Sequence, residues 1–332
     1  MYLLLARPRH VLLLLVLILV ATGLVVGPSL RSDASTGLLK AAPGYTGEPG
    51  ETGDPSDVDD LHDSNPELSG RADFRVATLN LKNTLGSAAV AHDIRLVINA
   101  GDPSIIGFQE RGGSKQAMLA ALPAHWALKM PTNHSGSDLT PIAFDTRIWK
   151  ARKSWASLLT GDTWRRARGN VAIDQYAVVA LLEHRETGHV VRVASFHMPS
   201  QIHNKSTGGP NFGQLDRVHA FWRMAASVRR LAPRTRNPGL QFVAVCDCNV
   251  SETRDVTELL VRGKITKPLD LATNYSAEEA GKRRSIDYVM AQRDKNFRIV
   301  GWESIDGGLI TDHPAVVATF REGKGAWHER TR

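Results

Sequence analysis

The sequence predicts an α/β domain built on a mixed sheet or two packed sheets, rather than on a doubly wound parallel sheet. Strand-like apolar runs alternate with helical patterns from Asp73 onward. No segment repeats along the chain, and many of the strand-like runs fall late in it. These observations favour one domain of mixed topology.

The elements are expected in the following order. Residues 74–81 (FRVATLNL) form a strand, residues 87–99 a helix and residues 105–109 a buried strand. A second helix spans residues 215–231, where apolar residues recur at helical spacing with arginines between them. Later strands are expected at residues 141–144, 175–182, 190–196, 241–245, 286–291 and 315–320.

Composition and charge narrow the class of protein. The chain has 332 residues, 42% of them hydrophobic and 23% charged, which allows a sizeable core and excludes disorder of the whole chain. Two cysteines exclude a disulfide-stapled scaffold. Of the 41 basic and 34 acidic side chains, five and nine precede residue 72, which leaves a net charge of +11 on residues 72–332. This charge favours a polyanionic partner such as nucleic acid.

Four segments are expected along the chain. Residues 1–27 carry Arg7 and Arg9 before an apolar run, which indicates a signal peptide or an N-terminal transmembrane anchor in contact with the membrane. Either interpretation places the remainder outside the cytoplasm, membrane-anchored or secreted. Residues 28–71 form a disordered, acidic, Gly/Pro-rich linker, residues 72–322 the folded domain, and residues 323–332 a basic C-terminal tail.

Polar side chains follow the apolar runs at the points where the predicted strands end. One such residue is common, but several could converge on one rim of a sheet, where oxygen ligands can gather around a hard cation. The residues concerned are Asn80, Glu110, His197, Asp247, Asn249, Asp287, Asp312 and His313.

At these positions the sequence resembles the endonuclease/exonuclease/phosphatase superfamily, which includes deoxyribonucleases, apurinic endonucleases, bacterial sphingomyelinases and inositol polyphosphate phosphatases. The matching blocks are TLNL, GFQE, SFHMPS, VCDCN, SIDYV and TDH, in the family's order and across essentially all of residues 72–320. The resemblance implies a four-layer α/β sandwich, with two packed mixed β-sheets flanked by helices.

The resemblance also implies roles for the residues in these blocks. Glu110 would be the principal Mg²⁺ ligand, with Asn80 and Asp312 beside it, and Mn²⁺ or Ca²⁺ are alternative ions. His313, oriented by Asp287, would act on the attacking water or on a phosphoryl oxygen. The remaining members are Asp247, which would position or deprotonate the water, Asn249, which would hold the phosphate, and His197, which would donate to a non-bridging oxygen.

The two cysteines flank Asp247 at positions 246 and 248. If the strand is extended there, Asp247 and Asn249 share one face and the cysteines share the other. A disulfide between positions i and i+2 of an extended strand has poor geometry, and no further soft ligands for a metal are evident. The pattern therefore favours small core residues over redox or metal chemistry for this pair.

The function expected from these features is that of an exported, metal-dependent hydrolase of phosphoric ester bonds, first of all a nuclease. Nucleic acid is the expected partner, and the basic segment at residues 164–170 (WRRARGN) either contacts phosphates or is a solvated loop. No protein partner is evident. The alternatives are a sphingomyelinase-like or other lipid or inositol phosphate phosphoesterase, and a catalytically silent module that binds nucleic acid or phospholipid.

Overall fold

The computed structural model describes residues 73–161, 174–204, 210–232, 240–250, 269–273, 286–292 and 297–322. All of them belong to a compact unit that spans Glu51–Arg332. The predictions for residues 1–27, 28–71, 164–170 and 323–332 lie outside these ranges and stay predictions. Within the described ranges, none of the helices is long and apolar enough to cross a membrane.

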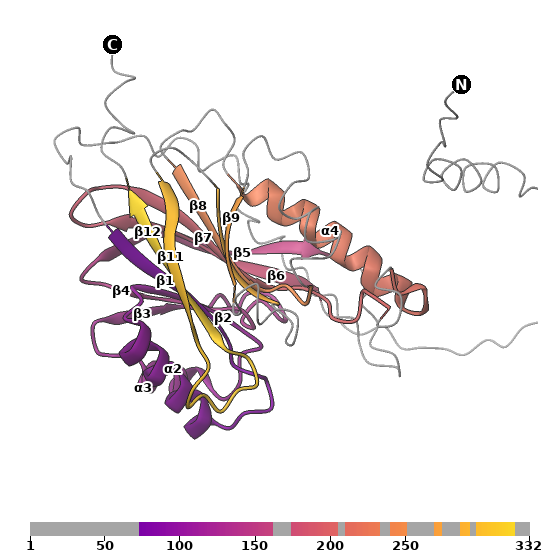
Figure 1. The fold of residues 1–332 in the computed structure, drawn as a ribbon, viewed down its shortest axis with the longest axis horizontal. Coiled ribbons are helices and arrows are strands. Elements are labelled where there is room, and N and C mark those ends of the chain that lie inside the picture. Colours follow the sequence, from indigo (N-terminus) through magenta and orange to yellow (C-terminus); the bar gives the residue numbers. More distant parts are fainter. Residues whose placement is uncertain are drawn as a thin grey trace, which may run out of the picture. The chain divides into compact units, whose positions relative to one another are not determined.

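The described strands form two six-stranded mixed sheets (Figure 1). Sheet A has the order β11-β12-β1-β2-β4-β3, and sheet B has the order β5-β6-β7-β8-β10-β9. The strands of sheet A are β1 (Asp73–Asn80), β2 (Ile105–Gln109), β3 (Trp126–Lys129), β4 (Ile142–Asp145), β11 (Phe297–Ile305) and β12 (Ala315–Glu322). Those of sheet B are β5 (Trp149–Thr160), β6 (Gln175–His184), β7 (Val190–His197), β8 (Leu240–Asp247), β9 (Leu269–Thr273) and β10 (Asp287–Gln292).

Three apolar clusters separate four layers. Side chains from the facing surfaces of both sheets, such as Val76 and Val245, form the middle cluster. The outer face of sheet A packs on α2 (Ser87–Gly101) and α3 (Lys115–Ala121), and the outer face of sheet B packs on α4 (Leu215–Leu231), which follows the short 3₁₀ turn η2 (Phe212–Gln214). Neighbouring side chains of a strand point to opposite faces of the sheet, so Val76 lies in the middle cluster and Ala77 in the cluster below α2. The predicted four-layer sandwich is confirmed.

The strand directions bring the predicted strand ends together. β1 runs parallel to β2, so Asn80 lies beside Gln109 and next to Glu110. β7 runs parallel to β8, which places His197 opposite Asp247, and the antiparallel β10 begins with Asp287 opposite Asp247. Both parallel pairs therefore end at the same edge, one in each sheet, which defines the site described next.

Candidate active site

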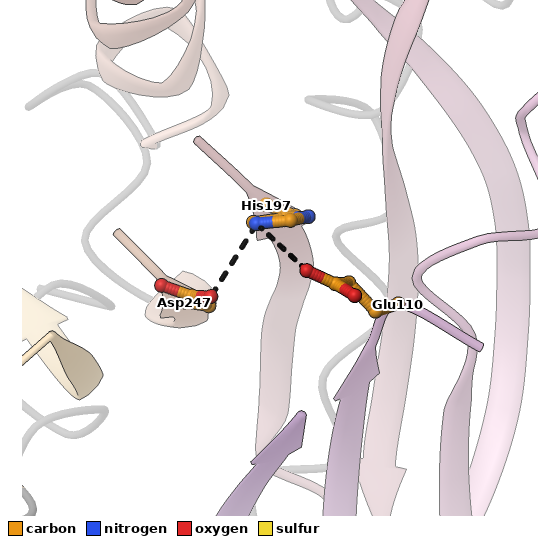
Figure 2. Close-up of side chains that lie close together, drawn as sticks. All are labelled: Glu110, His197 and Asp247. Carbon is orange, nitrogen blue, oxygen red and sulfur yellow. Dashed lines mark ion pairs between the residues drawn. The ribbon is translucent and has the colours of Figure 1, made fainter. Parts of the chain in front are cut away.

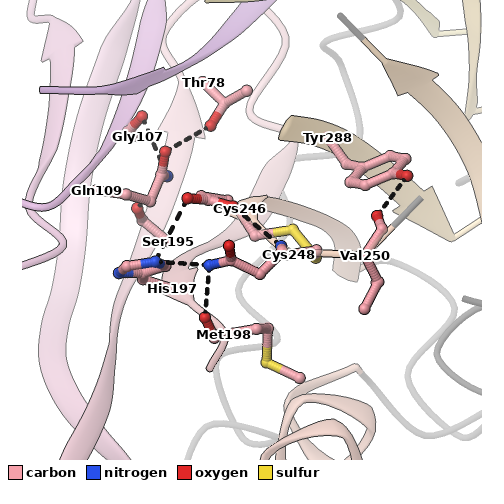
Figure 3. The surroundings of a disulfide bond; sticks show 12 residues. Thr78, Gly107, Gln109, Ser195, His197, Met198, Cys246, Cys248, Val250 and Tyr288 are labelled. Atoms are coloured by element: carbon pink, nitrogen blue, oxygen red, sulfur yellow. Dashed lines mark hydrogen bonds and ion pairs between the residues drawn. A yellow bond between two sulfur atoms is a disulfide. The ribbon is translucent and has the colours of Figure 1, made fainter. Parts of the chain in front are cut away.

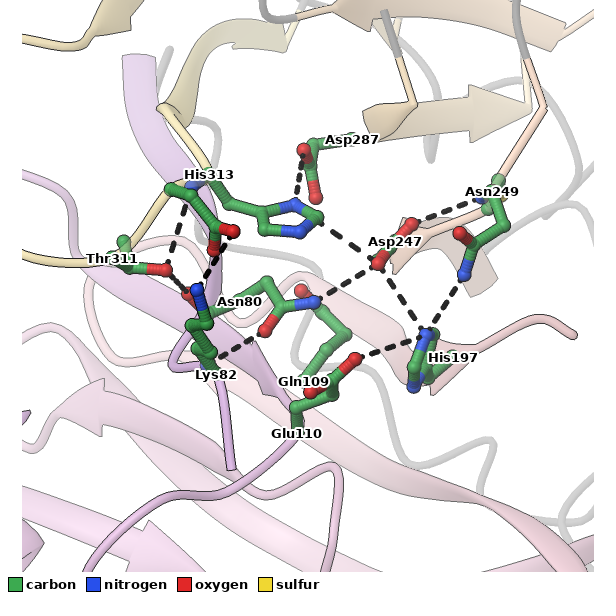
Figure 4. Close-up of polar contacts among 12 residues, drawn as sticks. Asn80, Lys82, Gln109, Glu110, His197, Asp247, Asn249, Asp287, Thr311 and His313 are labelled. Atoms are coloured by element: carbon green, nitrogen blue, oxygen red, sulfur yellow. Dashed lines mark hydrogen bonds and ion pairs between the residues drawn. The ribbon is translucent and has the colours of Figure 1, made fainter. Parts of the chain in front are cut away.

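Side chains from both sheets meet at this edge (Figure 4). They come from the ends of β1, β2, β7 and β8, the start of β10 and the loop before β12. Seven of the eight predicted site residues are linked there by hydrogen bonds or close ion pairs: Asn80, Glu110, His197, Asp247, Asn249, Asp287 and His313. The site therefore spans the gap between the two sheets.

His197 lies between two carboxylates (Figure 2). Its Nε2 is 3.3 Å from Oδ2 of Asp247 and 3.6 Å from Oε1 of Glu110. The same nitrogen lies 2.9 Å from Nδ2 of Asn249, whose amide also donates to the carbonyl of Met198 at 2.8 Å. Burial alone would lower the pKa of His197, but the charges of Asp247 and Glu110 outweigh it, and the pKa is raised.

Asp247 is the centre of the network. The residue is 1% exposed, its Oδ2 accepts from Nδ2 of Asn80 at 2.9 Å, and its Oδ1 accepts from the backbone N–H of Asn249 at 2.9 Å. Burial raises the pKa of Asp247, but the nearby imidazoles of His197 and His313 and the N–H of Asn249 prevail and lower it. Asp247 is therefore ionised at neutral pH.

His313 and Asp287 form a second pair on the other side of Asp247. Nδ1 of His313 lies 2.9 Å from Oδ2 of Asp287 and 4.0 Å from Oδ2 of Asp247. Burial raises the pKa of Asp287 to about 7, and the negative charge of Asp247 adds to this effect. Burial lowers the pKa of His313, yet its hydrogen bond and ion pair with Asp287 raise it to about 9. Burial thus raises the pKa of Asp287, whereas contact with carboxylates raises that of His313.

Backbone strain is concentrated at this edge. Lys82, Glu110 and Asn249 have left-handed backbone angles, with φ of 45°, 45° and 53°. Asn tolerates this conformation, whereas Lys and Glu pay a conformational cost that the surrounding contacts must offset. At Glu110 the turn follows directly after β2 and directs the carboxylate towards His197. Such strain is typical of functional positions.

The donor set suits a divalent cation. Two groups of three side chains have possible ligand atoms within 4.8 Å of one another: Glu110, His197 and Asp247, and Asp247, Asp287 and His313. Carboxylate oxygens dominate both groups, as hard cations require, and the surplus of negative charge is what a cation would neutralise. The described residues thus fit the predicted divalent metal, while the choice among Mg²⁺, Mn²⁺ and Ca²⁺ is left open.

Asp312 has different surroundings from the other predicted ligands. Its carboxylate accepts from Nζ of Lys82 at 2.9 Å, the side chain is 63% exposed, and it belongs to neither group of possible ligands. The hydrogen bond with Lys82 is the main reason that the pKa of Asp312 is lowered. The structure places Asp312 at the rim of the site and gives it a lysine partner.

The expectation for the cysteines is wrong in one respect, because Cys246 and Cys248 form a disulfide (Figure 3). β8 ends at Asp247, so the extended strand does not continue through Cys248. The two Cα atoms lie 5.2 Å apart, within the range that a disulfide bridges. The other half of the expectation is confirmed, since both cysteines are buried in the cluster below α4.

Several residues that the sequence analysis did not identify hold the site together. Gln109 accepts from Oγ1 of Thr78 at 2.9 Å and donates to Oγ of Ser195 at 3.3 Å, which links β2 to β7 across the sheet interface. Oγ1 of Thr311 donates to the carbonyl of Asn80 at 2.9 Å, and the carboxylate of Asp93 in α2 accepts from the backbone N–H of Thr311 at 3.0 Å. Gln109 and Thr311 directly neighbour predicted site residues in the sequence, whereas Asp93 is far from any of them and carried no such signal.

Comparison with known proteins places the fold. No protein-family model matches the sequence, and no curated protein matches it. Solved structures do match, at low identity. An endonuclease/exonuclease/phosphatase from Bacteroides vulgatus is 15% identical, with a TM-score of 0.55, over 76% of this chain and 99% of that one.

Two further solved structures match this chain. The mannosyl-6-phosphatase of Bacteroides thetaiotaomicron VPI-5482 is 16% identical, with a TM-score of 0.53, over 74% of this chain and 99% of that one. D. rerio TDP2, solved with a single strand DNA product, is 13% identical, with a TM-score of 0.52, over 75% of this chain and 99% of that one. The chain therefore has the endonuclease/exonuclease/phosphatase fold, as the motif blocks predicted.

Proposed function

We propose that the protein is a divalent-metal-dependent phosphoesterase of this superfamily that hydrolyses phosphodiester bonds of nucleic acid. The observation that carries the proposal is the ionised, buried Asp247 held between two imidazoles, with Glu110 beside it. A divalent metal bound by Glu110 and neighbouring oxygens would supply charge neutralisation for a phosphate oxygen and for the leaving group.

Three side chains of the site have separate roles in the proposed hydrolysis. Asp247 accepts a hydrogen bond from the attacking water and directs it, because Asn80 and the N–H of Asn249 fix both carboxylate oxygens. His197, with its raised pKa, donates a proton in a hydrogen bond to a non-bridging phosphate oxygen. His313, held by Asp287, is protonated at neutral pH and stabilises negative charge on the phosphoryl group.

Nucleic acid is favoured as the substrate by charge. Residues 72–332 carry a net charge of +11, which attracts a polyanion and makes its binding dependent on salt. The solved structure of TDP2 with a single strand DNA product is consistent with this choice, since that protein holds nucleic acid on the same fold.

The test offers the purified protein DNA, RNA and sphingomyelin with Mg²⁺, with and without chelator. Asp247→Asn and His313→Gln should each lower kcat/KM by about 10²-fold or more, the usual effect of removing a proton-transfer or charge-stabilising group. Asp216→Asn and His219→Gln on the exposed face of α4 are the matched controls and should retain activity.

The proposal fails if cleavage resists chelator or if the two site variants are as active as their controls. Turnover of sphingomyelin without cleavage of nucleic acid would move the substrate to lipid. Binding of DNA without turnover of any substrate would indicate a silent module.

A further inference from the structure

A pocket of about 460 Å³ lies on the outer side of sheet B, between the end of β5 and α4. These elements lie side by side in the fold (Figure 1). The pocket is lined by Leu158, Leu159, Thr160 and Gly161 from β5 and by Arg223, Ala226, Ser227 and Arg230 from α4. Its size is within the range of pockets that hold small molecules or single nucleotides.

The pocket lining is positively charged and carries no carboxylate. Arg223 and Arg230 lie seven residues apart, two turns along one face of α4. Nη2 of Arg230 donates to Oγ of Ser227 at 2.7 Å, and that hydroxyl donates to the carbonyl of Leu159 at 2.8 Å. The side chain of Arg230 is thus held next to the end of β5, which favours an anionic ligand.

Thr160 provides a second, independent observation. It is 6% exposed, and its Oγ1 is a buried atom without a hydrogen-bond partner in the described part of the chain. A buried hydroxyl without a partner costs free energy, so a ligand atom that pairs with it is favoured. The same pocket therefore combines two arginines with an unused hydroxyl.

The pocket and the candidate active site lie at the same end of sheet B. Leu158 of β5 pairs with Tyr176 of β6. β6 pairs with β7 through Val178 and Ser195, and continuing this register by two residues places Tyr176 opposite His197. Leu158 and His197 are therefore two strand spacings apart, about 10 Å along the sheet, with the pocket on the α4 side of sheet B and the His197 side chain on the side of Glu110 and sheet A.

We propose that this pocket is a second phosphate-binding subsite, which holds a backbone phosphate of a nucleic-acid strand whose scissile phosphate lies at His197 and Asp247. A strand with a phosphate at every nucleotide that passes over this end of sheet B can occupy both places at once. A phospholipid with a single phosphodiester cannot, which favours nucleic acid as the ligand of this pocket. The inference rests on the proposed function for the position of the scissile phosphate.

The test compares two adjacent arginines of α4. Binding of a fluorescein-labelled single-stranded 20-nucleotide DNA or RNA is measured by fluorescence anisotropy, in chelator so that no cleavage occurs. Arg230→Gln should raise Kd about tenfold and lower the slope of log Kd against log salt by about 0.7, the value of one lost contact to a single strand. Arg229→Gln removes the same charge one residue away, outside the lining of the pocket, and should change Kd less than twofold.

Two further variants distinguish a lost phosphate contact from a loss of folding. Arg223→Gln should weaken binding as Arg230→Gln does, and Thr160→Val should weaken it while leaving Tm unchanged or higher. Tm is measured for every variant.

The subsite is refuted if Arg229→Gln and Arg230→Gln have equal effects, if neither changes Kd, or if the strand does not bind at all. Arg230-dependent binding to vesicles of anionic lipid, without binding to the strand, would refute it as well. The readout is binding, so the absence of any hydrolysis would refute the proposed function without deciding the subsite.

Discussion

Replacement of Asp93 by Ala should loosen the loop that carries His313. Asp93 is fully buried in α2, and its two carboxylate oxygens accept from the backbone N–H groups of Ile310 at 2.8 Å and Thr311 at 3.0 Å. Thr311 in turn binds the carbonyl of Asn80 and accepts from the backbone N–H of His313. One side chain outside the site therefore fixes segments that carry two site residues.

The expected cost follows from these two bonds. Each hydrogen bond to a charged group contributes about 1.5 to 3 kcal/mol, and part is recovered because water can reach the more exposed N–H of Ile310. Asp93→Ala should therefore lower the free energy of unfolding by about 2 to 4 kcal/mol. Asp93→Asn keeps one acceptor oxygen and should lose about half as much.

Urea unfolding followed by far-UV circular dichroism measures this quantity. Asp102→Asn at the C-terminal end of the same helix is the control, since Asp102 is exposed and Asn tolerates its left-handed φ of 38°. If Asp93→Ala retains the unfolding free energy of the parent to within about 0.5 kcal/mol, or if the control loses as much, the described role of Asp93 is wrong. A drop in kcat for a small phosphodiester, with KM retained, would show that the loop also positions His313.

Three other predictions concern the cluster, the sheet interface and the disulfide. The pKa of His313 is raised from 6.5 to about 9, so its protonation contributes stability that is fully present below pH 6.5 and is lost as pH rises through 9. The free energy of unfolding of the metal-free protein should therefore fall by up to about 3 kcal/mol in that window. Urea titration at each pH measures this, and His313→Gln should flatten the dependence of the unfolding free energy on pH. A Cβ on Gly107 would overlap the side chain of Val245 in β8, so Gly107→Ala should lower the unfolding free energy by about 1 to 3 kcal/mol in the same assay. A Cβ on Gly301 would meet nothing within 4 Å, so Gly301→Ala should change the unfolding free energy little. A thiol titration should detect no free cysteine in the unfolded, unreduced chain, and replacing Cys246 and Cys248 by Ala should cost about 1.6 kcal/mol from the short loop alone, measured against the parent in the same urea assay.

The strands predicted from the sequence were those buried on both faces. β1, β2, β7 and β8 are apolar runs because each contributes side chains to a core cluster on either side, and their ends were predicted to within two residues. The strands that were missed, β3, β5, β9 and β11, include all the edge strands of the two sheets. β5 and β11 consist largely of half-buried or exposed residues that do not alternate regularly in hydrophobicity, so no period of two marks these strands.

The candidate site was predictable as a set of residues but not as a charge distribution. Polar residues at strand ends pointed to Glu110, His197 and Asp247, and the topology brought them together. Nothing local in the sequence shows that Lys82 pairs with Asp312, a residue 230 positions away. Such pairing depends on which loops meet, so the prediction for Asp312 as a ligand could not be weighed against its lysine partner before the fold was known.

The disulfide shows how a sound local rule fails when an element ends one residue early. Side chains alternate between the two faces of β8 up to Asp247, and this alternation correctly predicted that Cys246 is buried. Asn249 is of a residue type that tolerates the left-handed conformation, and its φ of 53° turns the chain there. Where β8 ends, the backbone N–H of Asn249 donates to Asp247, and the Cα atoms of Cys246 and Cys248 lie 5.2 Å apart. The disulfide and the hydrogen bond that orients the Asp247 carboxylate thus lie together at the end of β8, which places the pair of cysteines next to the candidate active site as well as in the core.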